Sequence, residues 1–226
     1  MVIPVLGIPY LTRSDLMLRA VTSINHPVDE LVIVDNSVDD TCPIVDGARH
    51  IKTGSNMGVS WAWNTIIMAT REAPYWVIAN ADIRFGPEDL VRMEERMQAG
   101  VDLLLNESMA LFAISGNCIQ TVGWFDTMFV PAYCEDNDYI YRSRLMGIDV
   151  QFLEPQFEHF GSASIKSSDG FRKANSVSYP MNVKYYREKW GGSMGHEVYT
   201  SPFDNGGSPR DTPPLDLDRL RALSWD

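Results

Sequence analysis

The amino-acid sequence predicts an α/β fold in which helices flank a mostly parallel central sheet. Short apolar runs alternate with segments of helical periodicity along the first half of the chain, as in strand–helix–strand units. Several of these runs end in Asp or Asn, which is typical of strand ends that open onto a ligand in parallel sheets. The 226 residues, 45% of them hydrophobic, suffice for one domain with a normal core.

The first half of the chain contains the clearest strand and helix patterns. Leu16, Ala20 and Ile24 recur at helical spacing between two apolar runs. A later helix has Pro87 near its start and Gly100 just past its end, an asymmetry that helices favour. The expected strands span residues 2–9, 30–36, 48–53, 75–80, 101–106 and 110–115, and the later helices lie within residues 56–73 and 86–100.

The second half is less regular. A short helix and turn are expected at 118–126, a helix at 135–148, two short strands within 149–161 and a last helix at 181–192. The polar, Gly- and Ser-rich stretch 162–178 predicts a mobile loop. We therefore expect one domain over residues 1–195 and a Pro- and Asp-rich extension, 196–226, in which residues 215–225 form a short helix.

Charge and cysteine content restrict the class of protein. The net charge of −11 argues against nucleic acid as a partner, and an anionic substrate would need a cation nearby. The N-terminus lacks the features of a signal peptide, and no apolar run approaches the roughly 18–20 residues that span a bilayer. Cys42, Cys118 and Cys134 lack metal-ligand spacing, so we expect free, mostly buried thiols in a reducing, cytoplasmic setting.

Acidic and amide side chains gather where the expected strands end. Asp35–Asn36 follows one strand, Asn80–Asp82 follows another, and Glu135–Asp136 opens a helix of the second half. Asp and Asn are ordinary turn residues, so one such cluster alone would mean little. Several clusters in order along an α/β chain instead indicate a ligand site at the carboxyl ends of the strands.

The stretch from residue 80 to residue 82 has the pattern of a cation site. Alternate residues of an extended segment point the same way, so Asn80 and Asp82 share one face while Ala81 turns toward the core. Carboxylate oxygens hold Mg²⁺ or Mn²⁺, which complete their shells with water and substrate phosphates. Such an ion would let an acidic protein bind a nucleoside diphosphate.

Six short motifs occur in a fixed order along residues 1–192. They read VIVDNSVDDT, NMGVSWAWN, IANAD, GWFDTMFVPAYCEDNDYIYRSRLMGIDV, HFGSAS and YYREKWGG. Each motif is weak alone, but their order and gaps resemble those of family-2 glycosyltransferases of the GT-A fold. The resemblance implies one GT-A domain with a Rossmann-like sheet. It also implies transfer of a hexosyl or deoxyhexosyl group from a nucleotide-diphosphate sugar to an acceptor hydroxyl, with inversion at the anomeric carbon.

The same resemblance implies roles for the residues that match the family's motifs. Asp82, in the Asp-X-Asp position, and His159 would hold Mn²⁺ or Mg²⁺, and Asp136 would be the catalytic general base. Asp35 would contact the base or ribose, and Asn64 would steady the nucleotide loop. The implied nucleotide-binding residues are Asp35, Asn36, Asn56, Gly58, Asn64 and Asn80.

The chain departs from the family pattern at two places. Asn80 replaces the first Asp of Asp-X-Asp, which removes a charge from the metal site. No Gln-X-X-Arg-Trp motif follows Asp136, which argues against a processive polysaccharide synthase. Glu135 and Asp138 compete with Asp136 for the role of base, and His159 has the plainer alternative of a satisfied strand residue.

Two other functions stay open at this point. The first is a catalytically degenerate nucleotide-sugar-binding module of the same fold, which Asn80 favours. The second is a sugar-nucleotide nucleotidyltransferase. Such an enzyme would need a Gly-rich basic loop after the first strand, but this sequence has only Gly7 and Arg13 there. The expected acceptor is a glycan, a protein or a lipid-linked molecule, and the extension 196–226 is the candidate element for a homo-oligomer.

Overall fold

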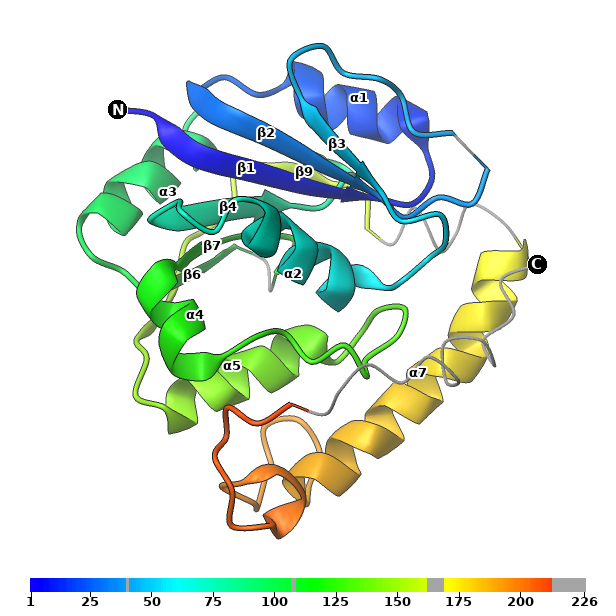
Figure 1. Ribbon diagram of the computed structural model, residues 1–226, viewed down its shortest axis with the longest axis vertical. Coiled ribbons are helices and arrows are strands. Elements are labelled where there is room, and N and C mark those ends of the chain that lie inside the picture. The colour runs from blue at the N-terminus through cyan, green and yellow to red at the C-terminus, as the bar shows by residue number, and fades with distance from the viewer. Residues whose placement is uncertain (40, 107–108, 162–168, 213–226) are drawn as a thin grey trace.

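A seven-stranded sheet crosses the centre of the molecule (Figure 1). The computed structural model describes residues 1–39, 41–106, 109–161 and 169–212. Side by side, the strands are β3 (Arg49–Lys52), β2 (Val28–Asp35), β1 (Ile3–Tyr10), β4 (Tyr75–Ala79), β7 (Leu111–Ser115), β6 (Leu103–Asn106) and β8 (Val150–Phe152). Within this sheet β7 is antiparallel to β4 and β6, and the other pairs are parallel. The prediction of a mostly parallel sheet is therefore confirmed.

Helices cover both faces of this sheet. One core layer joins it to α2 (Val59–Ala69), α4 (Gly116–Val122) and α5 (Glu135–Leu145), and layers on the other face join it to α1 (Ser14–Thr22) and α3 (Asp89–Gln98). Strand β4 serves both faces, because Trp76 and Ile78 pack in the α2 layer while Val77 and Ala79 pack in the α3 layer. Burial on both faces explains why β4 is a continuous apolar run.

A second, small sheet lies beside the first. It pairs β5 (Ile83–Arg84) with β9 (Glu158–His159) in antiparallel register, so that Ile83 lies opposite His159. The two short strands expected within residues 149–161 are confirmed as β8 and β9. Strand β5 is too short for its own sequence signal.

The second half contains one clear departure from the sequence-based expectation. The loop expected at residues 162–178 is wrong for its last part, because α7 (Asp169–Trp190) begins at Asp169 and includes Pro180. Residues 162–168 lie outside the described part of the chain. The buried face of α7 includes Ser178, Asn182 and Lys189, so the helix lacks the apolar periodicity that reveals most helices.

The described part of the extension packs against the domain. The N–H groups of Val198 and Tyr199 both donate to the carbonyl of Trp190, at 2.9 Å each, and the short 3₁₀ helix η1 (Pro202–Asp204) packs on α7. The helix expected at residues 215–225 lies outside the described residues, and the domain boundary at residue 195 stays a prediction. Among the described helices, none has the length and apolar character that crossing a membrane requires.

The three cysteines are free thiols, as the sequence predicts. Cys118 and Cys134 are buried and Cys42 is half-buried. Burial raises the pKa of each thiol to about 12, so all three are protonated and poorly nucleophilic at neutral pH.

Candidate active site

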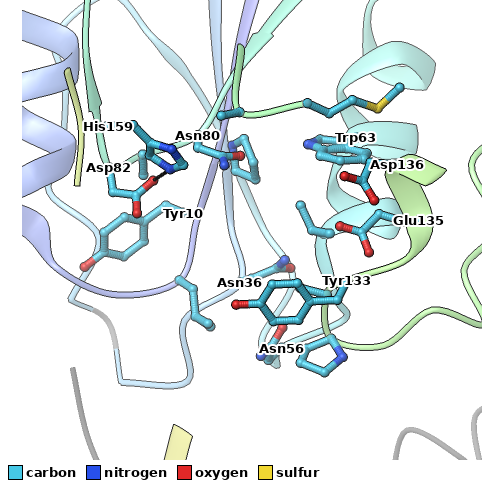
Figure 2. Close-up of a pocket in the computed structure, with 18 residues that line it drawn as sticks. Tyr10, Asn36, Asn56, Trp63, Asn80, Asp82, Tyr133, Glu135, Asp136 and His159 are labelled. Carbon is cyan, nitrogen blue, oxygen red and sulfur yellow. Dashed lines mark ion pairs between the residues drawn. The ribbon is translucent and has the colours of Figure 1, made fainter. Parts of the chain in front are cut away.

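A cavity of about 300 Å³ opens at the carboxyl ends of β1, β2 and β4 (Figure 2). This is the edge at which ligands bind in parallel α/β sheets. The cavity wall contains six of the predicted site residues, namely Asn36, Asn56, Asn80, Asp82, Asp136 and His159. Figure 2 shows Asp82 and His159 on one side, Glu135 and Asp136 on the other, and Asn80 between them.

The three residues that follow β4 all reach the cavity wall. Strand β4 stops at Ala79, and the N–H of Asn80 then donates to the carbonyl of Ala110 at 2.8 Å. Ala81 is buried and packs with Tyr10 and other core residues, but it also lines the cavity between Asn80 and Asp82. A buried strand thus ends by presenting an amide and a carboxylate to the cavity.

Asp82 and His159 meet through the small β5–β9 sheet. The carbonyl of Asp82 accepts the N–H of Phe160 at 2.9 Å, and Asp82 Oδ1 lies 3.4 Å from His159 Nε2. Over the described residues, no group of three or more His, Cys, Asp and Glu side chains is placed to hold a metal ion. A carboxylate and an imidazole on a cavity wall fit Mn²⁺ or Mg²⁺, because these ions take few protein ligands and fill their shells with water and phosphate oxygens.

The charge of the wall also fits a cation. The side chains of Asp82, Glu135 and Asp136 contribute carboxyl groups, and His159 is the basic side chain among them. In the described chain, neither Lys nor Arg lines this cavity. A diphosphate would therefore be repelled here unless a metal ion entered with it.

Gly58 orients two carboxamides of the wall. Its carbonyl accepts Asn36 Nδ2 at 3.2 Å, and its N–H donates to Asn56 Oδ1 at 3.0 Å. These bonds leave Asn36 Oδ1 and Asn56 Nδ2 buried without a hydrogen-bond partner in the described structure. A φ of +89° favours glycine at position 58, and a Cβ there would lie 3.1 Å from the carbonyl oxygen of Pro131.

Three predicted site residues lie outside the cavity wall, namely Asp35, Asn64 and Gly58. Asp35 and Asn64 instead support the loops of the cavity. Asp35 Oδ1 accepts the N–H and hydroxyl of Ser37 at 2.9 and 2.6 Å, which closes a turn after β2. The carboxamide of Asn64 exchanges two hydrogen bonds with the backbone of Phe125, at 2.9 and 3.0 Å. Nucleotide contact by these three residues stays a prediction.

The three carboxylates at the start of α5 occupy different environments. Asp138 is fully buried and is bound by Lys189, Arg142 and Trp190 at 2.7, 2.9 and 2.9 Å. Burial disfavours the charge of Asp138, but the two cations outweigh burial and lower its pKa. Asp138 is absent from the cavity wall, whereas Asp136 lines it, so Asp138 is the weaker candidate for a base.

Glu135 is also a weak candidate, for an electrostatic reason. Its side chain lines the cavity at 7% exposure, and Oε2 lacks a hydrogen-bond partner in the described structure. Burial, followed by repulsion from Asp136, raises the pKa of Glu135 well above its usual value of 4.5. A protonated carboxyl cannot take a proton, so Glu135 can act as a base only above its raised pKa, which leaves Asp136 as the stronger candidate.

We expect the Glu135→Gln variant to be more stable than the wild type at neutral and alkaline pH. The pKa of Glu135 is higher in the folded chain than in the unfolded chain, where it is near 4.5. Folding is therefore destabilised as the pH rises above 4.5, and the cost grows until the pH passes the pKa of the folded state. Glutamine stays neutral, so the gain should vanish below pH 4.5. Thermal unfolding from pH 4 to pH 9 measures the difference, and a gain that is equal at all pH values would contradict the raised pKa.

Several wall residues have no clear sequence signal. Trp63 lies in a core helix pattern, and its Nε1 is buried without a partner in the described chain. Pro131 and Tyr133 belong to an irregular segment before α5 and reach the cavity only through tertiary packing. All three residues lie within quoted motifs, Trp63 in NMGVSWAWN and the other two in GWFDTMFVPAYCEDNDYIYRSRLMGIDV, but nothing in those motifs points to a place on the wall.

Parts of this chain are similar in sequence to known glycosyltransferases. Residues 6–113 match the family model for glycosyl transferase family 2. A galactofuranosyl glycosyltransferase of Leishmania donovani is 34% identical over 139 residues, which cover 52% of this chain and 32% of that protein. The chain thus spans about a third of the length of this relative.

Solved structures show the same fold at low sequence identity. Glucosyl-3-phosphoglycerate synthase of Mycobacterium tuberculosis, in complex with Mn²⁺, uridine diphosphate and phosphoglyceric acid, has a TM-score of 0.57 at 14% identity, over 80% of this chain and 78% of that one. TarS 1–349 of S. aureus has a TM-score of 0.55 at 14% identity, over 67% and 58%. The chain therefore has the GT-A fold, and its residues 6–113 match the model of glycosyl transferase family 2.

Proposed function

We propose that this chain is an inverting glycosyltransferase that moves one sugar from a nucleoside-diphosphate donor to an acceptor hydroxyl. The observation that carries the proposal is the arrangement of the cavity in Figure 2. The Asp82–His159 pair lies on one side, and Asp136 lies on the other. This arrangement suits a reaction in which a diphosphate leaves from one side of a carbon while a hydroxyl attacks from the other.

Asp82 and His159 would hold Mn²⁺ or Mg²⁺ against the diphosphate of the donor. The ion supplies positive charge that offsets the negative charge of the leaving diphosphate. Asn80 stands where the family has an Asp, so it contributes an amide oxygen without a second negative charge. Asn36 and Asn56, at the ends of β2 and of the loop before α2, would contact the nucleoside.

Asp136 would accept the proton of the acceptor hydroxyl. The oxygen then forms a bond to the anomeric carbon as the bond from that carbon to the phosphate oxygen breaks. The proton stays on Asp136, and the electron pair leaves with the diphosphate. One such displacement inverts the anomeric centre, and the absence of a Gln-X-X-Arg-Trp motif supports transfer of one sugar at a time.

Uridine diphosphate is the nucleotide to test first, and UDP-galactofuranose is the donor to test first. Glucosyl-3-phosphoglycerate synthase is seen with uridine diphosphate, and the Leishmania relative is named for galactofuranosyl transfer. The rival reading as a degenerate binding module rests on Asn80. That rival predicts nucleotide binding without turnover, so the two readings differ in a measurable way.

The Asp82→Ala variant is expected to lose metal-dependent nucleotide binding. Isothermal titration of uridine diphosphate with and without Mn²⁺ should show tighter binding with Mn²⁺ in the wild type. Loss of the carboxylate should weaken that binding at least about tenfold, which corresponds to roughly 1.4 kcal/mol.

Asp149→Ala is the matched control, because Asp149 is exposed and lies outside the cavity wall. Titrations with guanosine and thymidine diphosphates in parallel report the choice of nucleotide. Equal affinity with and without Mn²⁺ in the wild type would contradict the metal role of Asp82 and His159.

A further inference from the structure

The segment that leads into Asp136 has a backbone conformation that ordinary side chains disfavour. Tyr133 and Cys134 are consecutive non-glycine residues with φ values of 79° and 76°. Such left-handed residues persist only where their surroundings fix them, and they concentrate at functional sites. Something in the fold must therefore hold the carbonyls before α5 in place.

Asn182 of α7 is the side chain that binds these carbonyls. It is fully buried, and its Nδ2 lies 3.2 Å from the carbonyl oxygen of Val130, 2.9 Å from that of Ala132 and 3.3 Å from that of Tyr133. The two N–H groups of the Asn182 carboxamide are thus shared among three carbonyl oxygens. The carbonyl of Pro131 accepts the N–H of Val59 at the start of α2 at 2.8 Å.

The same face of α7 binds the chain again beyond Asp136. Two turns after Asn182, Lys189 Nζ lies 2.7 Å from Asp138 Oδ1, and Trp190 Nε1 donates to the same oxygen at 2.9 Å. One helix therefore holds both the segment before Asp136 and the helical turn after it. Figure 1 shows α7 running beside α5 and the loop before it.

We propose that Asn182 is a positioning residue that sets the location of Asp136 relative to the cavity. The inference rests on the proposed function, because Asp136 acts as a base only in that reaction. Asn182 reaches Asp136 through the carbonyls of residues 130–133 and has no place on the cavity wall. The proposed nucleotide and metal groups lie at the ends of β2 and β4, in β9 and in the loop before α2, whereas the hydrogen bonds of Asn182 described above go to residues 130–133.

The Asn182→Asp substitution tests the proposal. The change keeps the shape but replaces the N–H donors by a carboxylate that faces three carbonyl oxygens. We expect the amides of residues 133–138 to exchange hydrogen faster, and kcat for sugar transfer to fall about tenfold or more. Binding of uridine diphosphate with Mn²⁺, and KM for the donor, should stay close to wild-type values.

The full chain serves for each measurement. Hydrogen–deuterium exchange reports the segment, titration with uridine diphosphate and Mn²⁺ reports the nucleotide site, and uridine diphosphate release from UDP-galactofuranose, UDP-galactose and UDP-glucose reports turnover. Lys184→Ala is the matched control, because the Lys184 side chain lies on the exposed face of α7. Asn182→Ser, which is small and uncharged, repeats the test if the Asp variant does not fold.

The outcomes separate this inference from the proposed function. Faster exchange at residues 133–138 together with lower kcat and intact nucleotide binding would support the positioning role. Unchanged exchange in that segment, or unchanged kcat, would overturn it. A wild type that binds no nucleoside diphosphate with Mn²⁺ and turns over none of the donors would overturn the proposed function. Hydrogen exchange would still decide whether Asn182 holds the segment.

Discussion

The Lys189→Met variant is expected to be less stable than the wild type by about 3–5 kcal/mol, the usual cost of breaking a buried ion pair from one side. Lys189 Nζ lies 2.6 Å from Asp126 Oδ2 and 2.7 Å from Asp138 Oδ1, and all three side chains are fully buried. Methionine would fill the space but leave two carboxylates without their shared cation. Urea unfolding measures the loss, and Tm should fall by about 6–20 °C in a chain of this length.

Two further variants show whether the loss comes from the buried charges. Lys184→Met makes the same substitution on the exposed face of α7, where Lys184 lies 3.7 Å from Glu188, and should cost at most about 1 kcal/mol. The double variant Lys189→Met with Asp126→Asn should recover part of the stability, because it removes one of the two buried carboxylates that have lost their cation. Equal losses at positions 184 and 189 would contradict the argument.

The strands and helices of the first half could be predicted because local pattern and tertiary packing agree there. Strand β4 is apolar on both faces because layers of helices cover both. The helix at residues 169–178 could not be predicted, since its buried residues are only Ala174 and Ser178 and Pro180 follows them. Asn182 and Lys189 are satisfied by partners 49 to 63 residues away in the sequence.

Some features of the candidate site could likewise be predicted from the sequence, and others could not. The geometry of an extended segment predicts that Asn80 and Asp82 share one face, and both line the cavity, although the buried Ala81 between them lines it as well. The sequence could not rank Glu135, Asp136 and Asp138, because their difference is environmental. Glu135 is buried beside Asp136, Asp136 is half-buried on the cavity wall, and Asp138 is enclosed by two cations.

Asp136→Asn is expected to lower the rate of sugar transfer by about 10²–10⁴, the range that general-base catalysis usually contributes. The amide is nearly isosteric with the carboxylate but cannot take the proton of the acceptor hydroxyl. Nucleotide binding with Mn²⁺ should survive, because Asp136 lies across the cavity from Asp82 and His159. Release of uridine diphosphate from the donor in the presence of acceptor measures the rate, and titration measures the binding.

Glu135→Gln is the control that identifies the base, because it makes the same chemical change one residue earlier on the same wall. The raised pKa of Glu135 favours a neutral carboxyl, so a neutral amide should disturb the reaction less than it does at position 136. An equal loss in both variants would show that the two carboxyls act as one unit. Full activity in Asp136→Asn would transfer the role of base to Glu135, and the pH at which activity appears should then follow the raised pKa of that residue.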